Sequence, residues 1–165
     1  MSYRIRDYVE SDAGAIHSLT LAAINTVGRA GYSQEQVDAW AARHGDAERL
    51  HSRVLSGHMV FVAVDAQDRP VAYALLEPDG HLDMLYCHPR HTRRGLADQL
   101  LDTAESQARS LGVERLYTEA SELARPAFER AGYELVRRRD FDLDGVPIHN
   151  FAMEKRLGQL PAARD

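Results

Sequence analysis

The chain has 165 residues, of which 44% are hydrophobic and 27% are charged, which suits one globular domain and leaves no room for two full ones. Its 20 lysines and arginines against 25 aspartates and glutamates give a net charge of -5, which argues against a general nucleic-acid-binding protein. A single cysteine, Cys87, excludes an internal disulfide bond and a multi-cysteine zinc site. No apolar run reaches the roughly 18 residues of a membrane span, and the N-terminus is too charged for a secretory signal. We therefore expect one cytoplasmic domain over residues 1–157, followed by a flexible polar tail over residues 158–165.

The first half of the chain is predicted to contain four strands and three helices. Ser33 and Gln36 form a capping-box pattern, which marks the start of one of the helices. The segment Met59–Asp65 is apolar almost throughout, as expected for a strand that is buried on both faces. The predicted strands cover residues 3–8, 59–65, 71–77 and 81–87, and the predicted helices cover residues 12–28, 34–40 and 47–55.

The second half begins with the most helical segment, Gly95–Leu111, where apolar residues form one stripe and charged residues face the other side. Gly112 ends this helix. A strand over 115–120, a short helix closed by Gly132, and strands over 133–141 and 146–155 complete the order. This order predicts an α/β (α+β) fold, with a mixed six- to seven-stranded sheet and helices on both faces.

The segment Leu85–Leu101 places a strand end, a basic loop and a helix start in direct succession. Backbone N–H groups at a helix N-terminus have no partners within the helix, so they can bind a phosphate, and Gly95 allows close approach. A P-loop is excluded because the only lysine is Lys155, and no GxG of a Rossmann fingerprint occurs. A nucleotide-dependent switch is therefore disfavoured. The alternative is that Gly95 simply starts a helix and the arginines are a solvated surface.

Several segments together resemble the GNAT superfamily of acyl-CoA-dependent N-acyltransferases. L-Y-C-H-P at Leu85–Pro89, followed by T-R-R-G-L-A at Thr92–Ala97, is similar to the family's Q/R-x-x-G-x-G/A signature after its fourth strand. Thr118–Tyr133 resembles the fifth strand and the following helix, whereas Gly145–Lys155 and Tyr32–Trp40 are similar to the YafP-like branch. The resemblance implies the GNAT fold, in which the fourth and fifth strands splay apart and hold acetyl-CoA between them.

The resemblance also implies which residues hold the cofactor. Backbone groups of Leu85, Tyr86 and Cys87 would pair with pantetheine, and an N–H near Leu85 would polarise the thioester carbonyl. Ser121 would help to place the cofactor, or would instead cap the following helix. The expected pyrophosphate loop consists of Thr92, Arg93, Arg94, Gly95, Leu96 and Ala97.

Two positions depart from the family pattern. Thr92 stands where Gln or Arg is usual, so one pyrophosphate contact is shorter or absent. Phe128 stands where many relatives have a tyrosine that protonates the leaving thiolate, so that role is vacant. Because a thiol has a pKa not far above neutrality, water can take over this role.

The acceptor amine must lose a proton, which requires a general base. By resemblance the candidates are His81 and Asp83, which share a strand face, and Glu119 on the next strand. Glu119 ranks first because its strand borders the cofactor cleft. Tyr32 and Trp40 either cover the acceptor as an aromatic lid or belong to the core, and we favour the core for Trp40.

The leading hypothesis is an N-acetyltransferase that transfers acetyl from acetyl-CoA to a small-molecule or peptide amine by direct attack in a ternary complex. The alternative is a catalytically degenerate GNAT module that binds or senses acyl-CoA. We expect no metal, no nucleic acid and no membrane partner, and a homodimer stays open. Cys87 is not expected to act as a nucleophile, because the adjacent His88 points to the opposite face of the strand.

Overall fold

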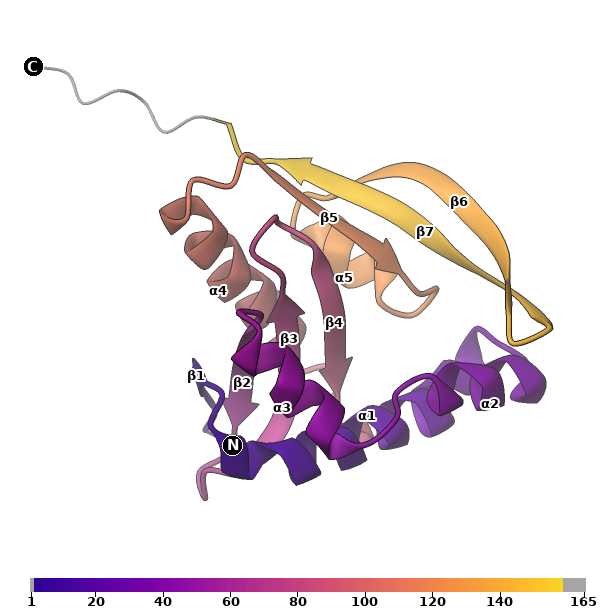
Figure 1. The fold of residues 1–165 in the computed structure, drawn as a ribbon, viewed down its shortest axis with the longest axis horizontal. Coiled ribbons are helices and arrows are strands. Elements are labelled where there is room, and N and C mark those ends of the chain that lie inside the picture. Colours follow the sequence, from indigo (N-terminus) through magenta and orange to yellow (C-terminus); the bar gives the residue numbers. More distant parts are fainter. Residues whose placement is uncertain (1, 159–165) are drawn as a thin grey trace, which may run out of the picture.

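The structure is a computed structural model that describes residues 2–158. Its seven strands form two antiparallel sheets, one in the order β1-β2-β3-β4 and one in the order β5-β7-β6 (Figure 1). The strands of the first sheet are β1 (Arg4–Asp7), β2 (Met59–Val64), β3 (Pro70–Leu76) and β4 (Leu82–Cys87). The strands of the second are β5 (Arg115–Ala120), β6 (Glu134–Leu143) and β7 (Val146–Arg156).

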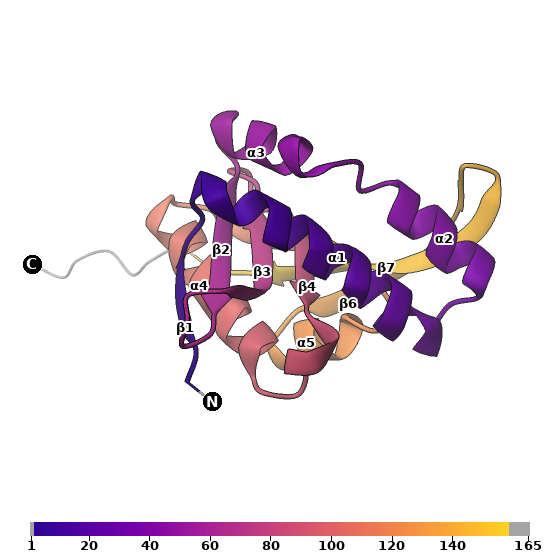
Figure 2. The same cartoon turned by 90° about the horizontal axis from the view of Figure 1, so that it is seen from below.

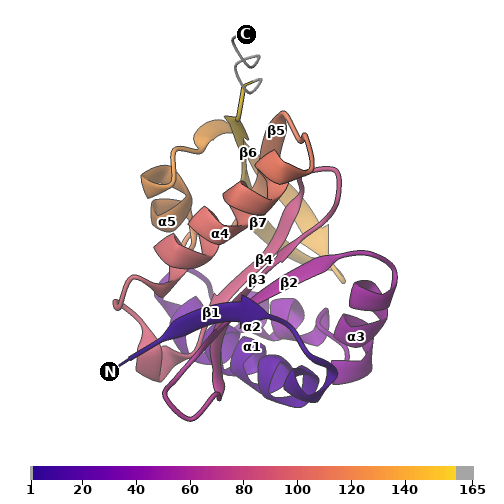
Figure 3. The same ribbon diagram turned by 90° about the vertical axis from the view of Figure 1, so that its left-hand side faces the viewer.

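Helices cover both faces of the first sheet. On one face lie α1 (Ala13–Val27) and α3 (Ala47–Leu55), whereas α4 (Leu96–Ser110) packs on the other, followed in the chain by α5 (Arg125–Arg130) (Figures 2 and 3). The helix α2 (Gln34–Ala42) packs against α1 and against β7 of the second sheet. The two inner strands, β2 and β3, are buried almost throughout because helices cover both of their sides. The apolar stripe of α4, which includes Leu100, Leu101 and Ala104, fills the core on its side.

Within residues 2–158, hydrogen bonds connect the two sheets where β4 and β5 begin. Here the Tyr117 amide donates to the Gly80 carbonyl (3.1 Å) and the Thr118 hydroxyl donates to the Leu82 carbonyl (2.7 Å). Gly80 has a φ of +105°, and a Cβ at this position would lie 2.2 Å from the Arg115 carbonyl oxygen, so only glycine allows the contact. Beyond it the parallel strands diverge toward α2 (Figure 1). The divergence opens an unpaired edge along the rest of β4.

The predicted mixed α/β fold with splayed fourth and fifth strands is confirmed. The splay is wide enough to divide the predicted sheet into two hydrogen-bonded parts. The capping box of Ser33 and Gln36 starts α2 as expected, and most predicted boundaries hold to within two residues. Over residues 2–158 no helix has the length and apolar character needed to cross a membrane. Of the expected tail, all but Gly158 lies outside the described residues.

Candidate active site

Two cavities flank the splay. The first, here called the α4-side cavity, has a volume of about 240 Å³ and lies between the end of β4, the N-terminus of α4 and α5. The second, here called the α2-side cavity, has a volume of about 400 Å³ and lies between β4, β5, β7 and the α2–α3 region. Both volumes suit parts of a small-molecule ligand. The two cavities share five lining residues at the splay, namely Trp40, Leu85, Tyr86, Ser121 and Ala124. They therefore meet where β4 and β5 separate.

The α4-side cavity ends at the predicted pyrophosphate loop. Gly95 caps α4 with a φ of +75°, and Arg93 has a φ of +60°, so the loop turns its backbone twice through the left-handed region. No side chain caps the helix, which leaves the amides of Leu96 and Ala97 without helical acceptors. Thr92, Arg93 and Arg94 are exposed around them. The loop is a positively charged, backbone-lined site for an anion.

The open edge of β4 exposes alternate backbone groups. The His88 amide donates to Val71 of β3 (2.8 Å), and in an antiparallel pair the groups that face the partner recur at every second residue. Tyr86 therefore directs its backbone to β3, whereas Leu85 and Cys87 direct theirs to the splay. Of the three expected backbone contacts, Leu85 and Cys87 have the required orientation. Tyr86 contributes its side chain to the cavities instead.

The three candidate bases cluster at one edge of the α2-side cavity, which Asp83 and Glu119 line. His81 Nε2 lies 2.9 Å from Glu119 Oε1 and 4.0 Å from Asp83 Oδ1, while its Nδ1 contacts Glu77. Burial alone would lower the pKa of His81, but the hydrogen bond and charge of Glu119, with Glu77 and Asp83, raise it to about 9. His81 is thus an imidazolium at neutral pH, held between two carboxylates. It can orient Glu119 but has no free nitrogen with which to accept a proton.

Asp83 is also engaged, because Arg53 of α3 donates to it at 2.5 Å. Glu119 keeps about a third of its side-chain surface exposed and lines the α2-side cavity. The ligand atoms of His81, Asp83 and Glu119 lie within 4.8 Å of one another, a spacing that a metal ion could span. Both nitrogens of His81 face carboxylates, those of Glu77 and Glu119.

The aromatic residues divide as follows. Tyr32 is buried, and its hydroxyl donates to the His149 carbonyl (2.9 Å) and accepts from the Glu122 amide (3.0 Å), which ties α2 to the second sheet. Trp40 is partly buried, lines both cavities and donates through Nε1 to the Tyr86 hydroxyl (3.1 Å). Tyr32 therefore connects the segment before α2 to the second sheet and also lines the α2-side cavity, and Trp40 forms part of the wall at the splay.

Three residues predicted to contact the cofactor, Ser121, Phe128 and Cys87, lie near the splay. The Ser121 hydroxyl accepts from the Ala124 amide (3.1 Å) in the turn before α5, and Ser121 also lines both cavities. Phe128 is buried against Tyr133, with ring centroids 4.9 Å apart, and offers no hydroxyl to the cavity. Cys87 lines the α4-side cavity, and burial raises the pKa of its thiol to about 11. The thiol stays protonated, which does not suit a nucleophile.

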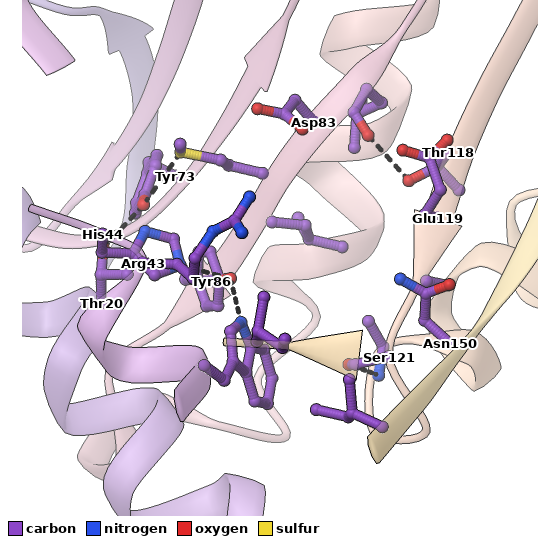
Figure 4. Close-up of a pocket in the computed structure, with 18 of the residues that line it drawn as sticks. Thr20, Arg43, His44, Tyr73, Asp83, Tyr86, Thr118, Glu119, Ser121 and Asn150 are labelled. Atoms are coloured by element: carbon purple, nitrogen blue, oxygen red, sulfur yellow. Dashed lines mark hydrogen bonds between the residues drawn. The ribbon is translucent and has the colours of Figure 1, made fainter. Parts of the chain in front are cut away.

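Sequence analysis missed His44 and Arg43 in the α2-side cavity. His44 Nε2 lies 3.1 Å from the Tyr86 hydroxyl, and both residues follow the last turn of α2 (Figure 4). The only sequence signal is that A-A-R-H-G follows Trp40, a helix end with an arginine and a histidine, which does not reveal where their side chains point. Only the packing of α2 against the splay brings them to the cavity.

Comparisons with protein families, with protein sequences and with solved structures give the same result. The acetyltransferase (GNAT) domain family matches residues 29–156. The uncharacterised N-acetyltransferase YafP of Escherichia coli K12 is 29% identical over 150 residues, which is 91% of this chain and 93% of YafP. A GCN5-related N-acetyltransferase from Rhodopseudomonas palustris is 33% identical, with a TM-score of 0.85 over 95% of this chain and 97% of that one.

A more distant structure shares the fold. The PaiA N-acetyltransferase from Thermoplasma acidophilum, solved in complex with coenzyme A, has 19% identity and a TM-score of 0.76 over 94% of this chain and 99% of its own. The family match spans most of the chain, and the R. palustris protein exceeds 30% identity over nearly its whole length. The resemblance found in the sequence is therefore confirmed. The chain belongs to the GNAT family and is an acyl-CoA-dependent acetyltransferase.

Proposed function

We propose that this enzyme transfers acetyl from acetyl-CoA to the amine of a small molecule or peptide, by direct attack in a ternary complex. The observation that carries the proposal is the meeting of the two cavities at the splay, where they share Leu85, Tyr86 and Ser121. A donor in the α4-side cavity and an acceptor in the α2-side cavity would bring thioester and amine together there. Holding two reactants in one geometry supplies much of the rate of such a transfer.

The donor fits the α4-side cavity in three respects. The loop amides from Arg93 to Ala97 and the positive end of α4 suit its pyrophosphate. The open backbone of Leu85 and Cys87 suits pantetheine, which would pair as an added strand. The Leu85 N–H would then donate to the thioester carbonyl oxygen and stabilise the negative charge that develops during attack. Related structures have been solved with acetyl-CoA or CoA bound, which supports this donor.

Glu119 is proposed as the general base. The acceptor ammonium gives its proton to the Glu119 carboxylate, directly or through water, and the neutral nitrogen attacks the carbonyl carbon. The tetrahedral intermediate loses the second proton of its nitrogen to water and collapses with cleavage of the C–S bond, and CoA leaves as a thiolate. His81 is a positioning residue, since its imidazolium holds Glu119 in place through a 2.9 Å hydrogen bond. Asp83, which is paired with Arg53, contributes negative charge near the ammonium.

The thiolate leaves without a side-chain acid in this mechanism, since Phe128 carries no proton to donate. A thiol pKa near 8.5 makes the thiolate a tolerable leaving group, and water can protonate it. Cys87 takes no covalent part, because its raised pKa keeps the thiol protonated.

A second candidate function rests on Phe128. The buried phenyl ring of Phe128 would suit a degenerate GNAT module that keeps the donor site and has lost turnover. Such a module would bind acyl-CoA tightly and release no CoA in response to any amine.

The experiment that separates the two functions is a screen of amines with acetyl-CoA, read by free thiol and by the mass of the N-acetyl product. Turnover that depends on the added amine supports the transferase. Tight acetyl-CoA binding by calorimetry, with no amine above the background hydrolysis rate across the panel, would favour the binding module. Absence of acetyl-CoA binding would contradict both.

A further inference from the structure

The α2-side cavity is electrostatically two-sided. Its β4–β5 wall carries Asp83 and Glu119, whereas Arg43, the residue after the last turn of α2, extends into the cavity from the opposite side (Figure 4). Arg49, at the start of α3, also lines the cavity and donates to the Arg43 carbonyl (2.9 Å). Negatively and positively charged side chains therefore lie on facing walls of one cavity.

The acidic wall carries more negative than positive charge. Three carboxylates, Glu77, Asp83 and Glu119, share two cations, the Arg53 guanidinium and the His81 imidazolium. His58 Nδ1 accepts from Arg53 Nε (3.0 Å). The excess of negative charge on this wall suits an ammonium group.

The opposite wall has positive charge without a partner. Among residues 2–158, neither Arg43 nor Arg49 makes an ion pair, and the Arg43 guanidinium makes no hydrogen bond. The nearby Asp46 uses its carboxylate to cap α3 through the Arg49 amide (3.1 Å). His44 adds a second polar group, since its ring lies against Tyr86 inside the cavity. Burial lowers the pKa of His44 to about 4, and the charges of Arg49 and Arg43 act in the same direction.

Between the two walls the cavity has apolar and aromatic lining as well as polar lining. Trp40, Phe141, Leu143 and Ile148 contribute to the apolar part. Arg43 is exposed, so a ligand carboxylate would be held there by charge-assisted hydrogen bonds to its guanidinium rather than by burial.

We propose that the acceptor is a zwitterion of amino-acid type, an amine that also carries a carboxylate, with the carboxylate bound by Arg43 and the ammonium facing Glu119. This inference rests on the proposed function and names its substrate class. A guanidinium can bind both oxygens of a carboxylate at once, which fixes the orientation of the acceptor as well as its affinity. The amine is thereby directed to the splay, where the thioester would lie.

The test compares acids with their amides. L-leucine, L-phenylalanine and the dipeptide leucyl-leucine are assayed beside their carboxamides and beside the plain amine phenethylamine. Carboxamides have the more easily deprotonated amine, so a preference for the acids cannot arise from amine reactivity. We expect kcat/KM to be at least about 10-fold higher for the acid of the preferred pair, the usual strength of a charged hydrogen bond. The three acids also show whether a free amino acid or a peptide carboxylate is the better source.

Variants locate the effect. Arg43→Gln is expected to lower kcat/KM for the acids by about 10–100-fold and to leave the carboxamides within about threefold, and Arg43→Lys is expected to recover part of the loss. Arg29→Gln, an exposed arginine of the α1–α2 connection outside both cavities, is the matched control. Thermal melting and acetyl-CoA affinity, both unchanged in Arg43→Gln, exclude misfolding and donor loss.

The outcomes are distinguishable. Turnover of carboxamides or phenethylamine that equals or exceeds that of the acids overturns the inference and leaves the transferase intact. An acid preference that survives in Arg43→Gln also overturns it. Absence of turnover with every amine overturns the proposed function, and the inference with it.

Discussion

The two cavities that meet at the splay are built from different material. The α4-side cavity is formed by backbone groups and by small or apolar side chains, with its polar end made of amides at the start of α4. The α2-side cavity is formed by charged and aromatic side chains from β4, β5, β7 and the α2–α3 region. A backbone-built site depends on a few local conformations, whereas a side-chain-built site depends on how distant segments pack. The first suits a constant cofactor and the second a variable acceptor.

The largest expected effect is on the backbone-built site. Gly95→Asp places a carboxylate where the pyrophosphate is proposed to bind, and we expect acetyl-CoA binding to fall below detection by calorimetry. No atom lies within 4 Å of a Cβ at Gly95, and the φ of +75° costs a residue other than glycine about 1–2 kcal/mol, so the fold should survive.

Gly112→Asp is the matched control for this substitution. Gly112 lies at the other end of α4, with a φ of +76° and equally open surroundings. The Gly112→Asp variant should have the same melting temperature as Gly95→Asp and should bind acetyl-CoA like the wild type. Unchanged affinity in Gly95→Asp would mean that the loop does not hold the donor.

The second effect is on the side-chain-built site. Glu119→Gln removes the proposed base, and we expect kcat/KM to fall by about 10²–10⁴-fold, the usual contribution of general acid–base catalysis. Acetyl-CoA affinity should stay within about threefold. Glu114→Gln, an exposed carboxylate just before β5, serves as the control. If Glu119→Gln, His81→Ala and Asp83→Asn all keep near-wild-type rates, no side chain of this cluster is the base.

The third effect follows from the charge of His81. Its pKa is about 9 in the folded protein and near 6.5 in an unfolded chain, so its interactions stabilise the fold fully below about pH 6.5 and are lost as the pH rises through about 9. The unfolding midpoint should therefore fall between pH 7 and pH 10 by about 2–6 °C more in the wild type than in His81→Gln. Parallel pH profiles of the two proteins would show that His81 is neutral in the native state.

The smallest effect is expected at Cys87. Cys87→Ala should keep kcat within about threefold, because the thiol is protonated and contributes only apolar surface to the α4-side cavity. Mass spectrometry of the wild type with acetyl-CoA and no acceptor should find no acetylated Cys87. A modified thiol that passes its acetyl group to the amine would refute direct transfer.

The difference between a backbone-built and a side-chain-built site also explains how well the sequence predicts each of them. The start of α4 is encoded locally, because Gly95 and the stripe that begins at Leu96 determine where the helix starts and which amides remain free. The strands were equally predictable from the sequence, since continuous apolar runs such as that of β2 identify buried strands.

The side-chain-built site was only partly predictable from the sequence. His81, Asp83 and Glu119 were named from strand positions, but the protonation of His81 depends on Glu77, which a turn brings back to it. His44 and Arg43 lie more than 40 residues from Tyr86 of β4 in the sequence, and only the packing of α2 against Tyr86 brings them into the cavity. No local pattern specifies such a contact.

A crystal structure of the enzyme with CoA tests most directly the claim that donor and acceptor meet at the splay. We predict that the pyrophosphate lies over the amides of Arg93–Ala97 and that the pantetheine pairs with Leu85 and Cys87. The thiol should then lie beside the Leu85 N–H and open onto the α2-side cavity, within reach of an amine held near Glu119. A thiol that ends elsewhere, or that is walled off from Glu119, would contradict the account.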